Sequence, residues 1–129
     1  MELAKAPDVQ KLIKRLITEL KLSHISANQV ICFRSKLATA KAYARIWSFP
    51  RIWQMALELK PHYVIEVLSE HYDRLPYEER LKVLIHELLH IPKTFSGSLV
   101  PHRNRGRKID RRNVEQLFNQ LKEIKKAKL

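Results

Sequence analysis

The chain has 129 residues and 45% hydrophobic residues, which is ordinary for a globular protein, and we expect one domain over residues 1–129. Its one cysteine, Cys32, excludes an intramolecular disulfide and fits a reducing cytosol. No apolar run is long enough to span a membrane and the N-terminus does not read as a signal peptide, so we expect a cytoplasmic protein without membrane contact. The 25 Lys and Arg residues against 13 Asp and Glu residues give a formal net charge of +12, which favours polyanionic partners, DNA or RNA first.

The first half of the chain predicts a helix followed by strands. Met1–Asp8 is short and mixed in character, so the first expected element is an amphipathic helix over Asp8–Lys21, where apolar residues recur at three- and four-residue steps. Apolar, β-favouring residues predict strands at Gln29–Lys36 and Lys41–Phe49. Ile52–Leu59 fits neither period cleanly, so a strand and a short helix both remain open there.

Aromatic residues in this half suggest buried positions. Trp47 and Trp53 are close in sequence, and we expect both in the core or in the wall of a site. An alternative is that Trp47 and Arg45 line a groove. Cys32, between Ile31 and Phe33, is expected to be a small buried hydrophobic residue rather than a nucleophile.

The second half predicts one clear strand and two helices. The strand covers His62–Ser69, and Glu70–Leu75 is a turn-rich link into a helix that carries the central motif. Asp110–Lys126 is helical by its apolar periodicity. The expected fold class is therefore α+β, with an N-terminal helix, a small sheet of three or four strands, a motif helix and a C-terminal helix.

The central motif is His-Glu-x-x-His within the apolar run Val83–His90. Because His86 and His90 are four residues apart, they lie one above the other on one helix face, close enough to share a metal ion. Glu87 lies about 100° round the helix and can reach a water on that metal. Two ligands and a general base from one helical turn are typical of zinc peptidases, so we predict a Zn²⁺ site with His86 and His90 as ligands and Glu87 as the catalytic base.

The residues around the motif favour a helix. Pro76 suits the first helical position, Glu78 and Glu79 suit the positive end of the helix dipole, and Pro92 ends the helix after His90. The residues expected to form one buried stripe are Tyr77, Leu81, Leu84, Ile85 and Leu88.

A catalytic zinc site needs a third protein ligand. After the motif helix, Pro92–Ser98 contains a proline to stop the helix and a glycine to turn the chain, and His102 follows it. We therefore choose His102 as the third ligand. His71, in the link before the helix, is the weaker alternative, whereas His62 and His24 are expected to be solvated or structural.

Basic residues are concentrated in the C-terminal segment. Residues 101–129 hold ten of the 25 Lys and Arg residues but three of the 13 acidic residues. Such a cluster attracts nucleic acid through its phosphates, although a solubilising surface would have the same composition. The residues proposed for nucleic-acid contact are Arg103, Arg105, Arg107, Lys108, Arg111 and Arg112.

Several motifs together resemble the phage and archaeal metallopeptidase family, which is itself similar to the SprT-like zincins. The resemblance covers roughly residues 29–114 and rests on Ala44–Trp47, Pro50–Gln54, His62–Val67, His86–Pro92, Phe95–Gly97 and Pro101–His102. It implies a minimal zincin fold with a small sheet beside the motif helix. It also implies His86, His90 and His102 as metal ligands and Glu87 as the base, but no particular substrate.

The sequence thus supports a zinc metallopeptidase acting on a protein or peptide substrate. The alternative is a basic nucleic-acid-binding module with a structural or inactive zinc site, and a third hypothesis joins both as a protease of nucleic-acid-associated proteins. If the strand containing Tyr63 is a sheet edge, an extended substrate can pair with it. Candidates for stabilising the oxyanion are Arg103, Asn104 and Tyr77.

Overall fold

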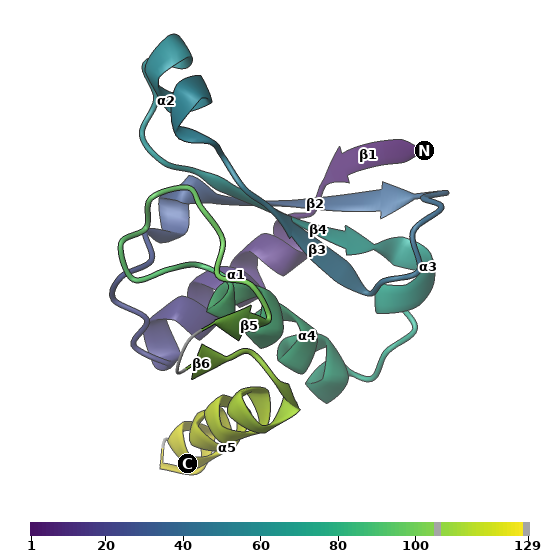
Figure 1. Cartoon of the computed structure of the whole chain (residues 1–129). Helices are drawn as coiled ribbons and strands as arrows, with labels where there is room; N and C mark the ends of the chain where they lie inside the picture. The colour runs from purple at the N-terminus through teal and green to yellow at the C-terminus, as the bar shows by residue number, and fades with distance from the viewer. Residues whose placement is uncertain (105–106, 128–129) are drawn as a thin grey trace.

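A four-stranded mixed sheet organises the fold (Figure 1). The computed structural model describes the backbone of residues 1–104 and 107–127, and the side chains of 1–102 and 109–126. The strands are β1 (Glu2–Lys5), β2 (Val30–Lys36), β3 (Ala44–Trp47) and β4 (Tyr63–Leu68), in the order β1-β2-β4-β3. The central pair, β2 and β4, is parallel, and both outer strands pair antiparallel to their neighbours.

Helices cover one face of this sheet and carry most of the apolar surface. In Figure 1, α1 (Pro7–Glu19) and α4 (Tyr77–Leu89) lie beneath the sheet, and α5 (Arg111–Ala127) lies beyond α4. Their apolar stripes meet the alternate residues of β2 and β4 that point inward. The largest fully buried side chains of this core include Tyr63, Tyr72, Ile13, Leu16 and Ile65.

The helices expected from apolar periodicity are present within two or three residues of their predicted ends. The expected strands are present too, the second shortened to Ala44–Trp47. Cys32 is 1% exposed and points into the core, as predicted. The open choice for Ile52–Leu59 is settled as a helix, α2 (Arg51–Leu57).

Three single elements and one two-stranded hairpin were not predicted. The segment before the first helix forms β1, which pairs with β2 although its own side chains are exposed. The turn-rich link contains a one-turn helix, α3 (Ser69–Tyr72), and a 3₁₀ turn, η1 (Ala27–Gln29), leads into β2. The fourth is the small hairpin that β5 (Arg103–Asn104) and β6 (Arg107–Lys108) form after the motif helix. The first three depend on long-range pairing or on single turns, which leave little periodic signal in a sequence.

The prediction of core positions for Trp47 and Trp53 is wrong, because they are 51% and 57% exposed. Trp47 instead lines two surface pockets, in keeping with the alternative that it forms the wall of a groove. Trp47 is on the sheet face opposite α1 and α4, where its indole N–H donates to Glu66 at 2.9 Å and Arg45 lies over its ring. Trp53 is on α2, which projects from the connection between β3 and β4 (Figure 1) and has no buried residue. Both tryptophans lie outside the buried core, which composition alone does not reveal.

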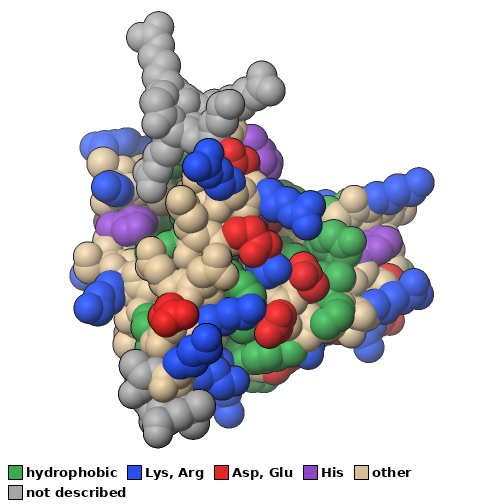
Figure 2. Space-filling view, turned by 90° about the horizontal axis from the view of Figure 1, so that it is seen from below, with side chains coloured by type: hydrophobic (Ala, Val, Ile, Leu, Met, Phe, Trp, Pro, Cys, Tyr) green, Lys and Arg blue, Asp and Glu red, His purple; other side chains and the backbone are tan. Residues whose placement is uncertain are grey.

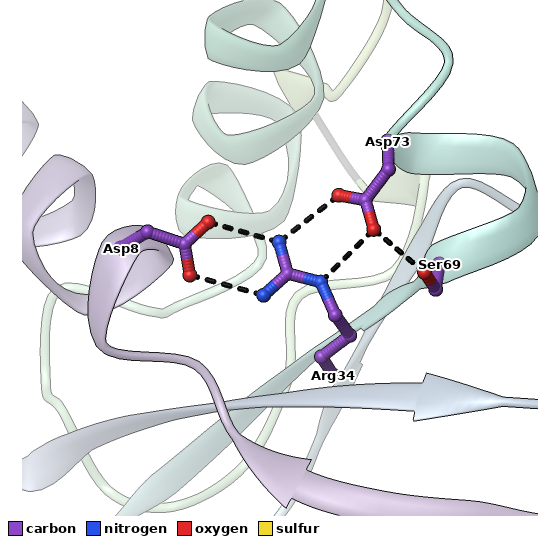
Figure 3. A network of polar contacts seen from close by, with 4 residues as sticks. All are labelled: Asp8, Arg34, Ser69 and Asp73. Atoms are coloured by element: carbon purple, nitrogen blue, oxygen red, sulfur yellow. Dashed lines mark hydrogen bonds and ion pairs between the residues drawn. The ribbon is translucent and has the colours of Figure 1, made fainter.

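An ion-pair network ties the start of α1 to β2 and to the end of α3 (Figure 3). The guanidinium of Arg34 makes two hydrogen bonds with each of two carboxylates, at 2.9–3.0 Å to Asp8 and at 2.9–3.0 Å to Asp73. Ser69 donates a further hydrogen bond to Asp73 at 2.6 Å. The hydrogen bond from Arg34 lowers the pKa of Asp8 below its usual value. This bidentate geometry fixes the relative position of three elements that are far apart in sequence.

Within the described residues, no helix is both long and apolar enough to cross a membrane.

Candidate metal centre

The motif helix α4 is held against the core by its apolar face, and this fixes the position of its polar residues. Leu81, Leu84, Ile85 and Leu88 are at most 3% exposed and hold one face of the helix against the core. Tyr77, predicted to belong to this stripe, is instead 43% exposed. It is the first residue of the helix, where the stripe passes beyond the core, and its hydroxyl accepts a hydrogen bond from Arg15 at 2.8 Å.

The helix ends where the motif ends. His90 is the last residue with helical geometry, and its N–H and that of Ile91 close the final turn onto the carbonyls of Glu87 and Leu88, both at 3.1 Å. Pro92 has no N–H with which to continue this pattern. Pro76 is the residue just before the first helical turn rather than within it, which shifts the predicted start by one position.

The segment after the helix folds back along it. Val100 donates its N–H to the His90 carbonyl at 2.7 Å, and its own carbonyl accepts a hydrogen bond from Nδ1 of His90 at 2.6 Å. Two residues later, the His102 carbonyl accepts the N–H of Ile109 at 3.2 Å. The chain is therefore held on both sides of His102.

Gly97 allows this return, because its φ of +94° is a conformation that side chains other than glycine rarely adopt. A Cβ at this position would lie 2.3 Å from the Phe49 carbonyl oxygen and 2.4 Å from the Gln54 side-chain nitrogen. Phe49 donates its N–H to the Gly97 carbonyl at 2.8 Å, and Gln54 donates to Ser96 and Phe49 carbonyls, both at 2.8 Å. The connection between β3 and α2 thus supports the loop that leads to His102.

The hydroxyl of Tyr63, on the sheet, binds the same loop at Gly97 and Ser98. Tyr63 is 1% exposed on β4, where it accepts the N–H of Gly97 and donates to the carbonyl of Ser98, both at 2.8 Å. Its ring packs on Phe95 with 5.1 Å between the ring centroids. The loop is therefore fastened to the central strand of the sheet as well as to the helix.

These contacts bring the three predicted histidines together. Nε2 of His86 lies 3.2 Å from Nε2 of His102 and 3.4 Å from Nε2 of His90, and one potential ligand atom from each of the three lies within 4.8 Å of the others. Nitrogens bound at 2.0–2.1 Å to one tetrahedral zinc are separated by about 3.3–3.4 Å. The spacing and the donor type both fit a zinc ion, with a fourth position left for water or substrate.

The protonation states also suit metal binding. Because Nδ1 of His90 points at a carbonyl, it must carry the proton, and the lone pair of Nε2 is left to face the other two rings. Burial lowers the pKa of His86 to about 4, and the neighbouring His90 and His102 add to the effect. Burial likewise lowers the pKa of His90. Neutral imidazoles are the form that binds a metal.

Glu87 lies beside this cluster in a poorly solvated position. It is 7% exposed, and burial raises the pKa of its carboxyl group to about 8. A nearby cation favours the ionised carboxylate and opposes that shift. Together with His86, Glu87 lines a pocket of about 520 Å³ between the start of β3, α4 and α5. A carboxylate next to three metal-binding groups in a solvent-accessible pocket can accept a proton from water.

Comparison with known families agrees with this geometry. The family model described as Putative phage metallopeptidase matches residues 1–124. The chain belongs to this phage metallopeptidase family. No curated protein and no solved structure matched the chain.

The other histidines are not part of the group formed by His86, His90 and His102. His71, the weaker alternative for the third ligand, lies on α3 and does not belong to the metal-binding group found among the described residues. His62 directly precedes β4, where its Nδ1 lies 2.6 Å from the Lys60 carbonyl and its ring meets Phe49 edge-on. The third member of the group is His102, the residue chosen from the sequence as the third ligand.

The condition for substrate pairing with the strand of Tyr63, that this strand is a sheet edge, is not met. β4 is an inner strand between β2 and β3, and the edge strand next to the motif helix is β3. Its outer edge pairs with no other strand of the described chain. The sequence could not distinguish these strands, because strand order depends on pairing between distant segments.

Three pocket-lining residues, from the segment before β3, from α4 and from α5, were also missed. Sequence reasoning identified the motif but not Tyr43, Lys82 or Glu115, which line the pocket with His86 and Glu87. Among the predicted oxyanion-stabilising groups, Tyr77 is bound to Arg15 and is not among the residues that line this pocket, whereas the side chains of Arg103 and Asn104 lie outside the described part of the chain.

The basic cluster is only partly described. Arg105 lies outside the described residues, as do the side chains of Arg103, Arg107 and Lys108. Arg111 and Arg112 are exposed at the start of α5, and Arg111 lines the same pocket as His86. Figure 2 shows that acidic, basic and apolar side chains are interspersed on the face seen from below, so the described residues of this face do not form a uniformly basic surface.

Proposed function

We propose that this metallopeptidase-family protein hydrolyses peptide bonds, with Zn²⁺ held by His86, His90 and His102 and with Glu87 as the general base. The observation that carries this proposal is the spacing of the three Nε2 atoms, 3.2 and 3.4 Å for two of the pairs, together with the buried carboxylate of Glu87, which lines a pocket with His86. The family match supports the same activity.

Each residue has a distinct part in this mechanism. When bound, zinc supplies Lewis-acid chemistry, polarising a carbonyl and making water acidic near neutral pH. Glu87 accepts the proton of the attacking water and passes it to the leaving amine. The carbonyl of Val100 holds His90 in one tautomer and one orientation, as an outer hydrogen bond does for a metal-binding histidine.

The free edge of β3 supports a substrate in extended conformation. Residues 42–44, at the start of this strand, line the pocket that contains His86 and Glu87. A peptide that pairs with this edge would run past both side chains, with its backbone held by strand hydrogen bonds. The substrate class favoured by this placement is therefore an unfolded or extended segment of protein.

The test replaces Glu87 with Gln, which preserves size and removes the basic carboxylate. We expect peptide hydrolysis to fall by about 10²- to 10⁴-fold, the usual contribution of a general base. Zinc content, measured by plasma mass spectrometry, should stay at that of the wild type because Glu87 is not one of the three ligands. Equal hydrolysis by wild type and Glu87→Gln would contradict the proposed mechanism.

A second candidate function adds nucleic acid as a partner. Its support is that Arg111, one of the exposed basic residues, lines the pocket next to His86, so a polyanion bound there would lie near the cleavage site. We propose cleavage of proteins associated with DNA or RNA. Hydrolysis should then rise when DNA is added and lose that stimulation in high salt. If the protein is only a binding module, wild type and Glu87→Gln should bind DNA equally well, and neither should cleave a protein substrate.

A further inference from the structure

The pocket beside His86 and Glu87 has walls suited to one kind of substrate side chain. Its volume of about 520 Å³ falls within the range of ligand-binding pockets, about 300–1,000 Å³. Small apolar residues line it from three different elements: Ala42 and Ala44 beside the sheet edge, Val83 on α4 and Val114 on α5. Because none of these side chains is large, the space between the elements is open rather than filled.

The charged residues of the pocket are largely occupied with one another. Nζ of Lys82 lies 2.9 Å from Glu115 and 3.3 Å from Glu79, and the same ammonium lies 4.9 Å from the centroid of the Phe118 ring. One ammonium thus neutralises much of the field of two carboxylates. Arg111, also at the pocket, is exposed and hydrated. Apart from Glu87, which is assigned to the reaction itself, no charged residue that lines the pocket in the described part of the chain is both buried and unpaired, so none of them selects a substrate side chain of opposite charge.

We propose that this pocket is the subsite for a large apolar side chain of the substrate, such as leucine, methionine or phenylalanine, next to the bond that is cleaved. The inference rests on the proposed peptidase function, and it adds a substrate preference to it. A large apolar side chain that fills the pocket removes the apolar walls from water and makes van der Waals contacts with them, and both effects favour binding. One methylene group in an apolar pocket discriminates by about 10- to 200-fold, so the preference over glycine should be easy to measure.

The experiment measures binding to the zinc-loaded full-length protein without requiring turnover. Glycine hydroxamate and leucine hydroxamate share the metal-binding group and differ in the isobutyl side chain. Isothermal titration calorimetry should give leucine hydroxamate at least a tenfold lower Kd. Ala42→Leu, which narrows the pocket, should remove this advantage. Ala40→Leu, in the same loop but not lining the pocket, should keep it.

A peptide library provides the second readout. Wild-type protein should cut preferentially beside large apolar residues, and Ala42→Leu should shift the preference to alanine and glycine. Equal affinity for the two hydroxamates, no binding of either, or an unchanged ratio in Ala42→Leu would overturn the subsite. If leucine hydroxamate is preferred but no peptide is cleaved, the subsite stands and the proposed hydrolysis fails. If peptides are cleaved without a preference for large apolar residues, the proposed hydrolysis stands and the subsite fails.

Discussion

Replacing Tyr63 with Phe tests whether the loop that leads to His102 is held by a single buried hydroxyl. The ring is 1% exposed and packs in the core, so Tyr63→Phe removes one oxygen atom and leaves the apolar contacts in place. That oxygen is the partner of both the Gly97 N–H and the Ser98 carbonyl, at 2.8 Å each. The substitution therefore leaves two backbone groups without their partner.

The expected loss of stability follows from those two groups. Leaving one buried backbone group unsatisfied costs about 1–3 kcal/mol, and the Ser98 carbonyl is partly reachable by water, so we expect a total of about 2–4 kcal/mol. For a chain of this length, 1 kcal/mol corresponds to about 4 °C in Tm, which gives a decrease of about 8–16 °C. Zinc should also bind about tenfold more weakly, because the same loop brings the Val100 carbonyl to His90.

A matched control lies elsewhere in the core. Tyr72 is also 1% exposed, but its hydroxyl has no hydrogen-bond partner within the described part of the chain. Tyr72→Phe should consequently leave the free energy of unfolding unchanged or raise it slightly. Urea denaturation and zinc titration of both variants provide the comparison. If the two variants match within about 0.5 kcal/mol, or if only Tyr72→Phe is destabilised, the reasoning is refuted.

Three further predictions concern the ligands, the turn and an ion pair. His102→Ala should weaken zinc binding by more than about 100-fold, because losing a ligand costs more than losing a hydrogen-bond partner of a ligand. His71→Ala should retain zinc. Equal zinc content in the two variants would point to another third ligand. Gly97→Ala should lower the free energy of unfolding by at least about 2 kcal/mol, because of its φ of +94° and the contact with the Phe49 carbonyl; a urea midpoint equal to that of wild type would contradict this. Burial alone would raise the pKa of Glu66, but hydrogen bonds from Arg45 and Trp47 hold it below its usual value. Its ionised form therefore contributes stability above the unfolded pKa near 4.5, and this contribution is lost as pH falls through the lower folded pKa. Glu66→Gln should be about 1–2 kcal/mol less stable than wild type at pH 7, and the difference should shrink below about pH 4; a difference independent of pH would refute this assignment.

The part of the site that lies on one helix was predictable from the residues alone. His86, Glu87 and His90 are three residues of a single turn, and the geometry of a helix places i and i+4 together whatever the rest of the chain does. The approach of His102 was predictable in outline, because a proline and a glycine mark a chain that stops and turns. Its contacts were not predictable, since the Tyr63 hydroxyl on β4 and the Phe49 backbone in the connection between β3 and α2 are distant from the loop in sequence.

The errors have a common physical cause. Tyr77 continues the spacing of a buried stripe but lies beyond the core, and Trp47 and Trp53 are apolar but lie outside the core. Glu2–Lys5 has no strong strand signal because its stability comes from pairing with β2 rather than from burial. In each case the environment of the residue depends on packing or pairing with segments that are far away in sequence.

By itself, the sequence determined the helical segments, the inner strands and the metal-binding motif, because each depends on periodicity or spacing within about twenty residues. The tertiary structure alone decided that β4 is an inner strand and β3 the free edge. It also decided that Ala42, Val83 and Val114 enclose one pocket beside Glu87. The physical reason is that strand order and pockets arise from packing between elements, and packing joins residues that no local pattern connects.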